Sequence, residues 1–440
     1  MRSLALLVVA AGVVAAILAG PAAADTPPSL LFELASGSNS VYCAATWPRT
    51  ITPAPSGQGC TITQPAGGTA WCFVKKSTSG PTPITQTCTI KQTSTTRDNF
   101  AYVIEIAEHR GGTSPQETTQ IATVEQGNTV KTNNSWVTQI TRQAFGKLLD
   151  SDGDYWGSWA FATNANQIQN ATQQARVCQG GVSDCSVGTG MLSHNKSSVI
   201  QKQWQTEQAA ATSSINQEQN TATAPLCTSP GSEPANMCSD VDQTTDPSGS
   251  GRNKEGVTQL YVQLQNARGK GATDTTQRQG GADVFTGGLE HDIVQAGGGV
   301  ANITTGQNSF QFQKASNVGP LLQKQDPRIS KDATSMQEGA AGSLWTGNQR
   351  AFQFQLEDGA LVTSFGGQHT RLEYFGTTIG GTISANQFVN QNGQTQSQSC
   401  GPGTSCDLLL DCTNVEPDDY LTTVLTLEPQ ECFTSEESED

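Results

Sequence analysis

The feature that most constrains the fold of this chain is the tripeptide Gln-x-Gln, which recurs between Gln167 and Gln355 and includes five copies at similar intervals. Its glutamines alternate with a residue that is apolar in most copies, and alternation with period two is typical of β-strands. The successive intervals of 50, 46, 48 and 42 residues indicate a degenerate repeat. The copies are Gln167-Ile168-Gln169-Asn170, Gln217-Glu218-Gln219-Asn220, Gln263-Leu264-Gln265-Asn266, Gln311-Phe312-Gln313 and Gln353-Phe354-Gln355.

One such element buries too little apolar surface to be stable alone, whereas stacked copies bury a continuous stripe. We therefore predict that the five copies are neighbouring strands of one continuous sheet or solenoid. The residues between the glutamines should share a buried face, and the glutamines should line the other face. The buried residues would be Ile168, Leu264, Phe312 and Phe354.

A second pattern places an asparagine six residues before a glutamine, with spacings of 62 and 58 residues that are not in step with the first pattern. Its copies are Asn133 to Gln139, Asn195 to Gln201 and Asn253 to Gln259. One segment leaves two alternatives open. From Val199 to Gln219 the apolar residues also fit helical spacing, and Ala, Gln and Glu favour helix. By analogy with the other copies we favour strand.

The composition favours the same architecture, because the chain has 35% hydrophobic and 14% charged residues and 45 glycines. So little apolar material leaves backbone ladders, side-chain amide bonds and disulfides to stabilise the fold. The predicted fold class is all-β, an elongated repeat sheet or β-solenoid-like architecture that is stapled by disulfides. A net charge of −15 excludes nucleic acid and anionic membranes as expected partners.

The first 24 residues have the order of a secretory signal peptide. Met1-Arg2 precedes an apolar run from Leu4 to Leu18, and the small residues Ala22 to Ala24 precede Asp25. A retained membrane anchor is the alternative, but a spanning helix needs about 20 apolar residues with a stop-transfer flank. No later segment approaches that length. We expect a secreted protein, extracellular or on the cell surface, without membrane insertion.

An even number of cysteines in an exported chain predicts a set of disulfides. Zinc is the rival interpretation, but no Cys-x-x-Cys is present and the four histidines are scattered singly. Proximity in sequence suggests the bridges Cys178 to Cys185 and Cys227 to Cys238, while connectivity as a whole stays open. The cysteines are Cys43, Cys60, Cys72, Cys88, Cys178, Cys185, Cys227, Cys238, Cys400, Cys406, Cys412 and Cys432.

Composition divides the chain into a signal peptide (1–24), a Cys-rich β region (25–112), a Gln/Asn-rich repeat region (113–398) and an acidic, Cys-containing segment (399–440). The turn-forming run from Gly111 to Pro115 marks the first internal boundary. Residues 240–256 are rich in Asp, Ser, Gly and Pro, and we interpret them as an exposed loop. The tail beyond Cys432 is acidic and predicted to be disordered.

Two segments of the repeat region resemble the repeat of curli-type amyloid subunits, namely Asn133-Asn134-Ser135-Trp136-Val137-Thr138-Gln139 and Asn195-Lys196-Ser197-Ser198-Val199-Ile200-Gln201. The Cys-bearing version is similar to exported Gln-rich proteins of high-GC Gram-positive bacteria that have no known function. The curli resemblance, over Gln120 to Gln398, implies a β-solenoid that stacks into extracellular fibres. Curli-type repeats are shorter and lack twelve cysteines.

One loop has the alternating carboxylates with which calcium loops begin, at Asp150, Asp152 and Asp154. Its glycine stands at the fourth place rather than the sixth, and the twelfth place is Phe161. A solvated turn is therefore the favoured alternative to calcium binding.

Catalytic motifs give little support for an enzyme. A glycosidase would need two carboxylates across a sugar bond and aromatic rings to stack on it. Trp156 and Trp159 lie beside the acidic loop, and Glu290 and Asp292 flank His291, but nothing in the sequence pairs them. Motifs for a serine nucleophile, a zinc protease or a phosphate loop are not found. We expect no enzyme and no required cofactor.

Three functions remain, in order of preference. The first is an extracellular structural or surface-associated protein, such as a cell-wall or matrix component, that self-associates through stacked strands. The second is a secreted binding module for polysaccharide or protein. A glycoside hydrolase comes last.

Overall fold

A computed structural model describes the parts of the chain from which both sheets are built. These parts are residues 40–44, 59–64, 67–94, 96–127, 132–145, 161–180, 194–220, 236–245, 251–269, 274–280, 287–296, 300–316, 321–336, 343–358, 367–378, 381–414 and 431–437. Within them the regular structure is all β-strand, as the sequence predicts, and no helix there is long and apolar enough to cross a membrane. The strands form two sheets, one of ten and one of twelve strands.

Sheet A is the ten-stranded sheet. In spatial order it contains β1 (Ser40–Ala44), β3 (Gly68–Thr78), β5 (Asn99–Arg110), β7 (Thr132–Ala144), β9 (His194–Ala211), β12 (Arg252–Gly269), β15 (Val300–Ser316), β17 (Leu344–Asp358), β19 (Thr382–Gln391) and β20 (Gln394–Gly403).

Sheet B is the twelve-stranded sheet. It contains β2 (Gly59–Gln64), β4 (Ile84–Gln92), β6 (Gln116–Gln126), β8 (Asn166–Gln179), β10 (Ile215–Gln219), β11 (Met237–Thr244), β13 (Thr275–Gly280), β14 (Gly287–Ala296), β16 (Leu321–Met336), β18 (Gly367–Thr377), β21 (Ser405–Asn414) and β22 (Glu431–Glu437). Two of its rows are each filled by two short strands, β10 with β11 and β13 with β14.

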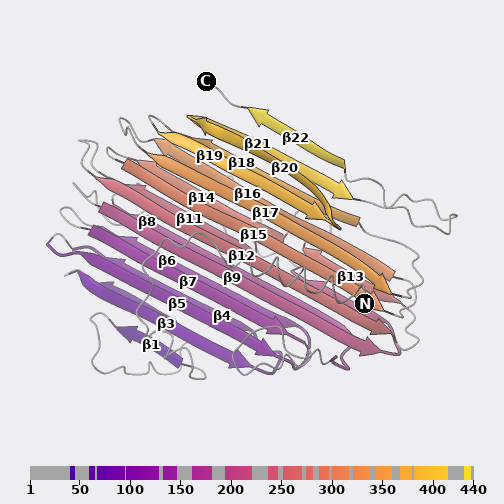
Figure 1. The fold of residues 1–440 in the computed structure, drawn as a ribbon. Helices are drawn as coiled ribbons and strands as arrows, with labels where there is room; N and C mark the ends of the chain where they lie inside the picture. Colours follow the sequence, from indigo (N-terminus) through magenta and orange to yellow (C-terminus); the bar gives the residue numbers. More distant parts are fainter. Residues whose placement is uncertain are drawn as a thin grey trace.

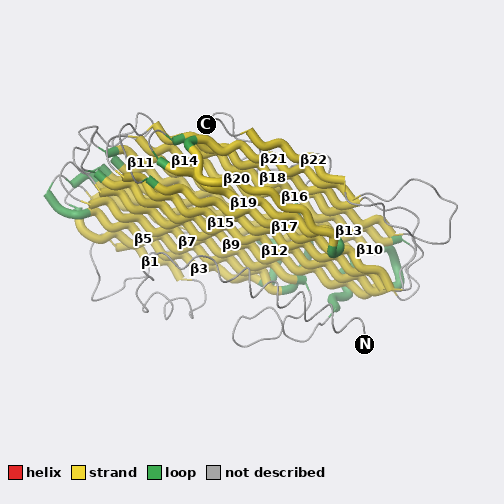
Figure 2. The backbone as a smooth tube through the Cα atoms, turned by 45° about the horizontal axis from the view of Figure 1, so that its top comes forward, coloured by secondary structure: helices red, strands yellow, loops and turns green. Residues whose placement is uncertain are grey.

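The chain alternates between the two sheets, so that strands far apart in sequence become parallel neighbours (Figure 1). Figure 2 shows the same stack, with β1 and β22 towards its opposite ends. Pairing is parallel from β3 to β19 in sheet A and from β2 to β18 in sheet B. It becomes antiparallel where β1 meets β3, and for the last strands β20, β21 and β22. Strands of reversed direction therefore close sheet A at both ends and sheet B at its C-terminal end.

The five Gln-x-Gln elements do not lie in one continuous sheet, so the prediction of a single sheet was wrong. The first two belong to β8 and β10 of sheet B, and the other three belong to β12, β15 and β17 of sheet A. Three of the four intervals still join register partners, for example Gln167 with Gln217 and Gln263 with Gln311. The interval of 46 residues crosses from one sheet to the other.

The predicted orientation of these elements was also wrong. Their glutamines face the space between the sheets, and Gln263 is fully buried. By alternation the residues between them point away from the opposite sheet, where Leu264 is buried and Phe312 and Phe354 pack half-buried in the same cluster. The reason is that a row of glutamines in register can satisfy its own amides, so that a polar row can occupy the interior.

The second pattern of the sequence follows the register along its whole length. Asn133, Asn195 and Asn253 are aligned across β7, β9 and β12, and the glutamines six residues later are aligned in the same strands. The segment from Val199 to Gln219 forms β9 and β10, so the strand interpretation is confirmed.

Small apolar residues complete the interior between the rows of amides. One cluster joins aligned valines of sheet A to aligned residues of sheet B, at zero or near-zero exposure. Its central members are Val103, Val137, Val199 and Val257 from sheet A with Val124, Val177 and Val241 from sheet B. The opposed sheets thus bury alternating layers of apolar and amide side chains.

Two segments that we expected to be irregular are strands. Within the predicted loop 240–256, Asp240 to Thr244 belong to β11 and Arg252 to Gly256 to β12. The polar residues misled the prediction because they occupy one face of β11, whose other face buries Val241 and Gln243. The acidic tail forms β22 as far as Glu437, where it pairs with β21, so the disorder predicted beyond Cys432 was wrong for residues 433–437.

Candidate functional site

Most of the site residues that sequence motifs suggested lie outside the described residues. These are Asp150, Asp152 and Asp154 and the neighbouring Trp156 and Trp159, and the signal peptide lies outside them too. The structure therefore offers no geometry for calcium binding. The chemistry that it does bring together lies in a group of cysteines, in ladders of amides and around His291.

The cysteine cluster consists of Cys43, Cys60, Cys72 and Cys88, each from a different strand among β1 to β4. Cys43 is the register partner of Cys72 in sheet A, and Cys60 is the register partner of Cys88 in sheet B. Disulfides join Cys43 to Cys60 and Cys72 to Cys88, with Cα–Cα distances of 6.2 and 5.9 Å. Both bonds cross from one sheet to the other at the N-terminal end of the stack.

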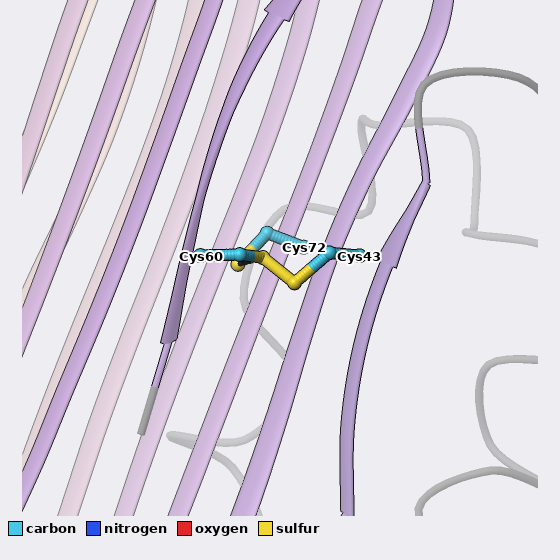
Figure 3. Close-up of side chains that lie close together, drawn as sticks. All are labelled: Cys43, Cys60 and Cys72. Atoms are coloured by element: carbon cyan, nitrogen blue, oxygen red, sulfur yellow. Dashed lines mark hydrogen bonds between the residues drawn. A yellow bond between two sulfur atoms is a disulfide. The ribbon is translucent and has the colours of Figure 1, made fainter. Parts of the chain in front are cut away.

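The two disulfides of the cluster touch, because the Sγ atoms of Cys60 and Cys72 are 2.8 Å apart. Figure 3 shows Cys43, Cys60 and Cys72 converging in the space between the strands. Their Sγ atoms all lie within 4.8 Å of one another, a spacing that would suit a soft metal ion. All of these sulfurs are in disulfides, however, and a metal ligand must be a free thiolate.

A third disulfide joins the sheets at the other end of the stack. Cys400 of β20 is bonded to Cys406 of β21, and the two residues are 5% and 0% exposed. Cys178, Cys238 and Cys412 are also disulfide-bonded, and no free cysteine occurs among the described residues. The partners suggested for Cys178 and Cys238, namely Cys185 and Cys227, lie outside the described residues. The expectation of a disulfide-stapled fold is confirmed.

Glutamine ladders run through the interior of both sheets. In each, the Nε2 of one glutamine donates to the Oε1 of its register partner in the preceding strand. The longest passes from Glu105 through Gln139, Gln201, Gln259, Gln307, Gln349 and Gln387 to Gln398, with donor–acceptor distances of 2.6–2.9 Å. A matching ladder in sheet B contains Gln64, Gln92, Gln126, Gln179, Gln243 and Gln295, with distances of 2.7–2.8 Å.

In many of the ladder amides, the second hydrogen is donated to a carbonyl of the opposite sheet. Gln139 donates to the carbonyl of Gln174 at 2.8 Å, and Gln265 donates to the carbonyl of Arg278 at 2.9 Å. A separate asparagine ladder donates in the opposite sense, from Asn99 towards the later strands. Side-chain amides thus join neighbouring strands and also hold the two sheets together.

Two ladders begin with a glutamate instead of a glutamine. Glu105 accepts from Gln139 at 2.8 Å, and Glu207 accepts from Gln265 at 2.9 Å. On the side away from the ladder, the register partners of the two glutamates are Val74 and Phe145. Neither side chain can accept a hydrogen bond from an amide, whereas a glutamine at the start of a ladder would require such an acceptor.

Burial changes the acidity of both glutamates. Desolvation raises the pKa of Glu105 to about 8, although the hydrogen bonds from Gln139 and the Cys88 backbone oppose the shift. Desolvation likewise raises the pKa of Glu207 well above its ordinary value, against the hydrogen bond from Gln265. At neutral pH Glu105 is therefore predominantly a neutral acid that takes the place of an amide.

His291 lies in the interior between a hydroxyl and a carboxylate. Its Nδ1 is 2.6 Å from the Oγ of Ser239, and its Nε2 is 3.1 Å from Oε1 of Glu255. The set resembles a nucleophile, base and carboxylate, but all three side chains are at most 2% exposed and face the space between the sheets. A substrate would have to reach a hydroxyl in a packed interior, so the geometry fits a buried polar contact better than a catalytic centre.

Sequence reasoning missed most of these groupings. Glu290 and Asp292 flank His291 in sequence, whereas the groups that contact its ring, Ser239 and Glu255, come from β11 and β12. The ladders did leave a signal in the sequence, because Gln139 and Gln201, which are 62 residues apart, are register partners in neighbouring strands. The disulfide pairing within the cysteine cluster left no signal in the sequence, since it depends on which strands face each other.

A comparison of the chain with protein-family models, curated proteins and solved structures found no match.

Proposed function

We propose that this chain is an exported structural protein, a rigid slab of stacked strands that associates end to end with further copies through its outer strands. The observation that carries the proposal is the set of amide ladders in register across both sheets. Ladders of this kind stabilise stacked strands within one chain and between chains by the same hydrogen bonds.

The outer strand β20 has the properties of a pairing edge. It has no charged residue, and Gln398, the last rung of the longest ladder, has an amide oxygen that suits a further donor. Edge strands that avoid pairing usually carry charges or proline. In β20 the single proline, Pro402, lies near the end of the strand.

Charge favours a head-to-tail arrangement of copies. The last strand of sheet B, β22, contains Glu431, Glu436 and Glu437. Towards the opposite end of the stack, Lys75 and Lys76 lie in β3, one strand in from the terminal strand β1. Like ends would repel each other, whereas unlike ends attract.

The proposal is tested on the secreted protein by electron microscopy and by sedimentation over a range of micromolar concentrations. We expect elongated assemblies that grow with concentration. The double variant Thr395→Lys/Ser397→Lys places charge on exposed positions of β20 and should reduce assembly strongly. Thr119→Lys, on the outer side of β6, a strand with hydrogen-bonded neighbours on both sides, is the control and should assemble normally. A monomer at every concentration contradicts the proposal.

A binding module for polysaccharide or protein remains the second candidate, because aromatic residues gather on the outer side of sheet A. Trp71, Tyr102 and Trp136 are aligned across β3, β5 and β7. The rings of Trp71 and Tyr102 stack on each other, with centroids 4.1 Å apart and planes 9° apart. Ring faces used in this way are not free to stack on a sugar, so this observation supports the candidate less than the ladders support assembly. Retention of the monomer on insoluble polysaccharide would favour it.

A further inference from the structure

We propose that the cysteine cluster is a thiol–disulfide exchange site, at which a thiolate freed on Cys60 attacks Cys72 and releases Cys88. The proposal does not depend on self-association. It rests on the arrangement of four sulfurs in two touching disulfides, each contributed by a different strand.

The sulfurs form a chain from the outside of the fold to its interior. Cys43 and Cys60 are half-buried, whereas Cys72 and Cys88 are 1% and 0% exposed. A reductant in solution therefore meets the Cys43–Cys60 bond first. The Cys72–Cys88 bond lies among the apolar residues of the core, where a reductant cannot approach without opening the sheets.

The contact between the disulfides provides an internal route to the buried bond. Exchange requires a thiolate to reach one sulfur of a disulfide, and the Sγ of Cys60 lies 2.8 Å from the Sγ of Cys72. Because β2 and β3 hold these residues in their ladders, the two sulfurs cannot drift apart as they would in a loop. Proximity of this kind replaces a bimolecular encounter by an intramolecular step.

The reaction begins with a dithiol as the reductant. The dithiol reduces the Cys43–Cys60 bond, becomes a cyclic disulfide and leaves two thiols, of which Cys60 ionises. The Cys60 thiolate then forms a bond to Cys72 while the Cys72–Cys88 bond breaks, and the Cys88 thiolate takes up the proton that Cys60 released. Two electrons enter in total, and the products are thiols on Cys43 and Cys88 and a disulfide between Cys60 and Cys72.

The test uses the full secreted chain with one equivalent of dithiothreitol, followed by acid quenching, alkylation, unfolding and peptide mass spectrometry. We expect alkylated Cys43 and Cys88 together with a peptide linked through Cys60 and Cys72. Alkylation of Cys43 and Cys60 without any such linked peptide would overturn the proposal.

A variant tests the same step without a reductant. Cys43→Ser leaves Cys60 without its partner, and we expect a Cys60–Cys72 bond and a thiol on Cys88. The matched control is Cys406→Ser, which leaves a thiol on Cys400, a residue with no second disulfide beside it in the described part of the chain. In this control, alkylation should modify Cys400. If alkylation modifies Cys60 in a Cys43→Ser chain whose circular dichroism spectrum is native, the exchange is contradicted.

Discussion

A glutamine buried between these sheets must satisfy two amide hydrogens and an oxygen, and its register row together with the facing sheet can supply all three partners. Gln263 donates to Gln205 at 2.9 Å and to the carbonyl of Gln219 at 3.2 Å, and it accepts from Gln311 at 2.8 Å. Each side chain depends on the next, so a glutamine that is neutral in isolation becomes costly to remove from the middle of a row.

Replacing Gln263 by leucine should therefore destabilise the fold strongly. The change leaves the Gln311 amide without an acceptor, and the Gln205 oxygen and the Gln219 carbonyl each lose a donor. Each orphaned buried group costs about 1–3 kcal/mol. Denaturant titration followed by circular dichroism measures the effect. Gln174→Leu, on the outer side of β8, is the control and should change stability by less than about 1 kcal/mol.

Glu105 predicts an unusual dependence of stability on pH. Its folded pKa of about 8 lies above the ordinary value of 4.5, so between these values the folded chain keeps a proton that the unfolded chain has lost. Its contribution to the free energy of unfolding is present below pH 4.5 and falls as pH rises towards 8, by about 1.4 kcal/mol per pH unit.

The variant Glu105→Gln should reduce the loss of stability between pH 7 and pH 8. This window avoids His109, whose pKa is lowered by burial and whose contribution is lost as pH falls below its ordinary value of 6.5. Glu207 keeps part of the dependence, since its pKa is also raised. Glu125→Gln, at a partly exposed ion pair with Lys91, is the control. Equal pH slopes in Glu105→Gln and the unmodified chain would contradict the assignment.

At the scale of single elements, the turns decide whether successive strands can change sheets. β5 ends at Arg110 and β6 begins at Gln116, and the turn between them contains Gly111 and Gly112 at φ of 67° and 90°. A Cβ on Gly112 would lie 1.9 Å from the carbonyl oxygen of Ser79, whereas a Cβ on Gly111 would meet nothing within 4 Å. Of these two glycines, Gly112 alone combines left-handed backbone with a close approach.

The two glycines of this turn form a matched pair for mutagenesis. Gly111→Ala should cost about 1–2 kcal/mol, the usual penalty of a left-handed backbone with a side chain. Gly112→Ala should cost more, because the backbone at Ser79 must also move. Thermal unfolding of both variants gives the comparison, and equal midpoints would show that the turn can relax.

The repeat could be predicted from sequence only in part, because the chain places the same chemistry on two sheets. Two of the intervals join register partners within one sheet, namely Gln167 with Gln217 and Gln263 with Gln311. The interval from Gln217 to Gln263 joins residues of different sheets, so the sequence shows two ladders as one series. The strands themselves were predictable from alternation. The buried face of the strands was not predictable, since glutamine is ordinarily an exposed residue and only the strand register shows that its amides are paired.

At the scale of the whole molecule, covalent bonds join the sheets at both ends of the stack. Cys43–Cys60 and Cys72–Cys88 act at β1 to β4, and Cys400–Cys406 acts at β20 and β21. The central strands β9, β12 and β15 contain no cysteine and are held by ladders on both sides. End strands have fewer neighbours and open more readily than central ones.

Hydrogen exchange should therefore respond to reduction at the ends. In the oxidised chain we expect slow exchange throughout the ladders, slowest in β9, β12 and β15. Reduction should speed exchange in β1 to β4 and in β20 and β21, while those three central strands stay protected. Mass spectrometry of peptides from each strand measures this. A uniform rise over all strands would mean that the disulfides support the entire stack and not its ends.

The glutamine ladders donate in one direction, from later strands to earlier ones, and this gives the molecule a polarity like that of a cytoskeletal filament. Gln398 at one end has an amide oxygen that suits a donor, while Glu105 near the other end has replaced the donating amide by an acid. The two ends are therefore chemically distinct even where their backbones are alike. Any fibre built from such units would inherit a plus and a minus end, and growth at the two ends would proceed at different rates.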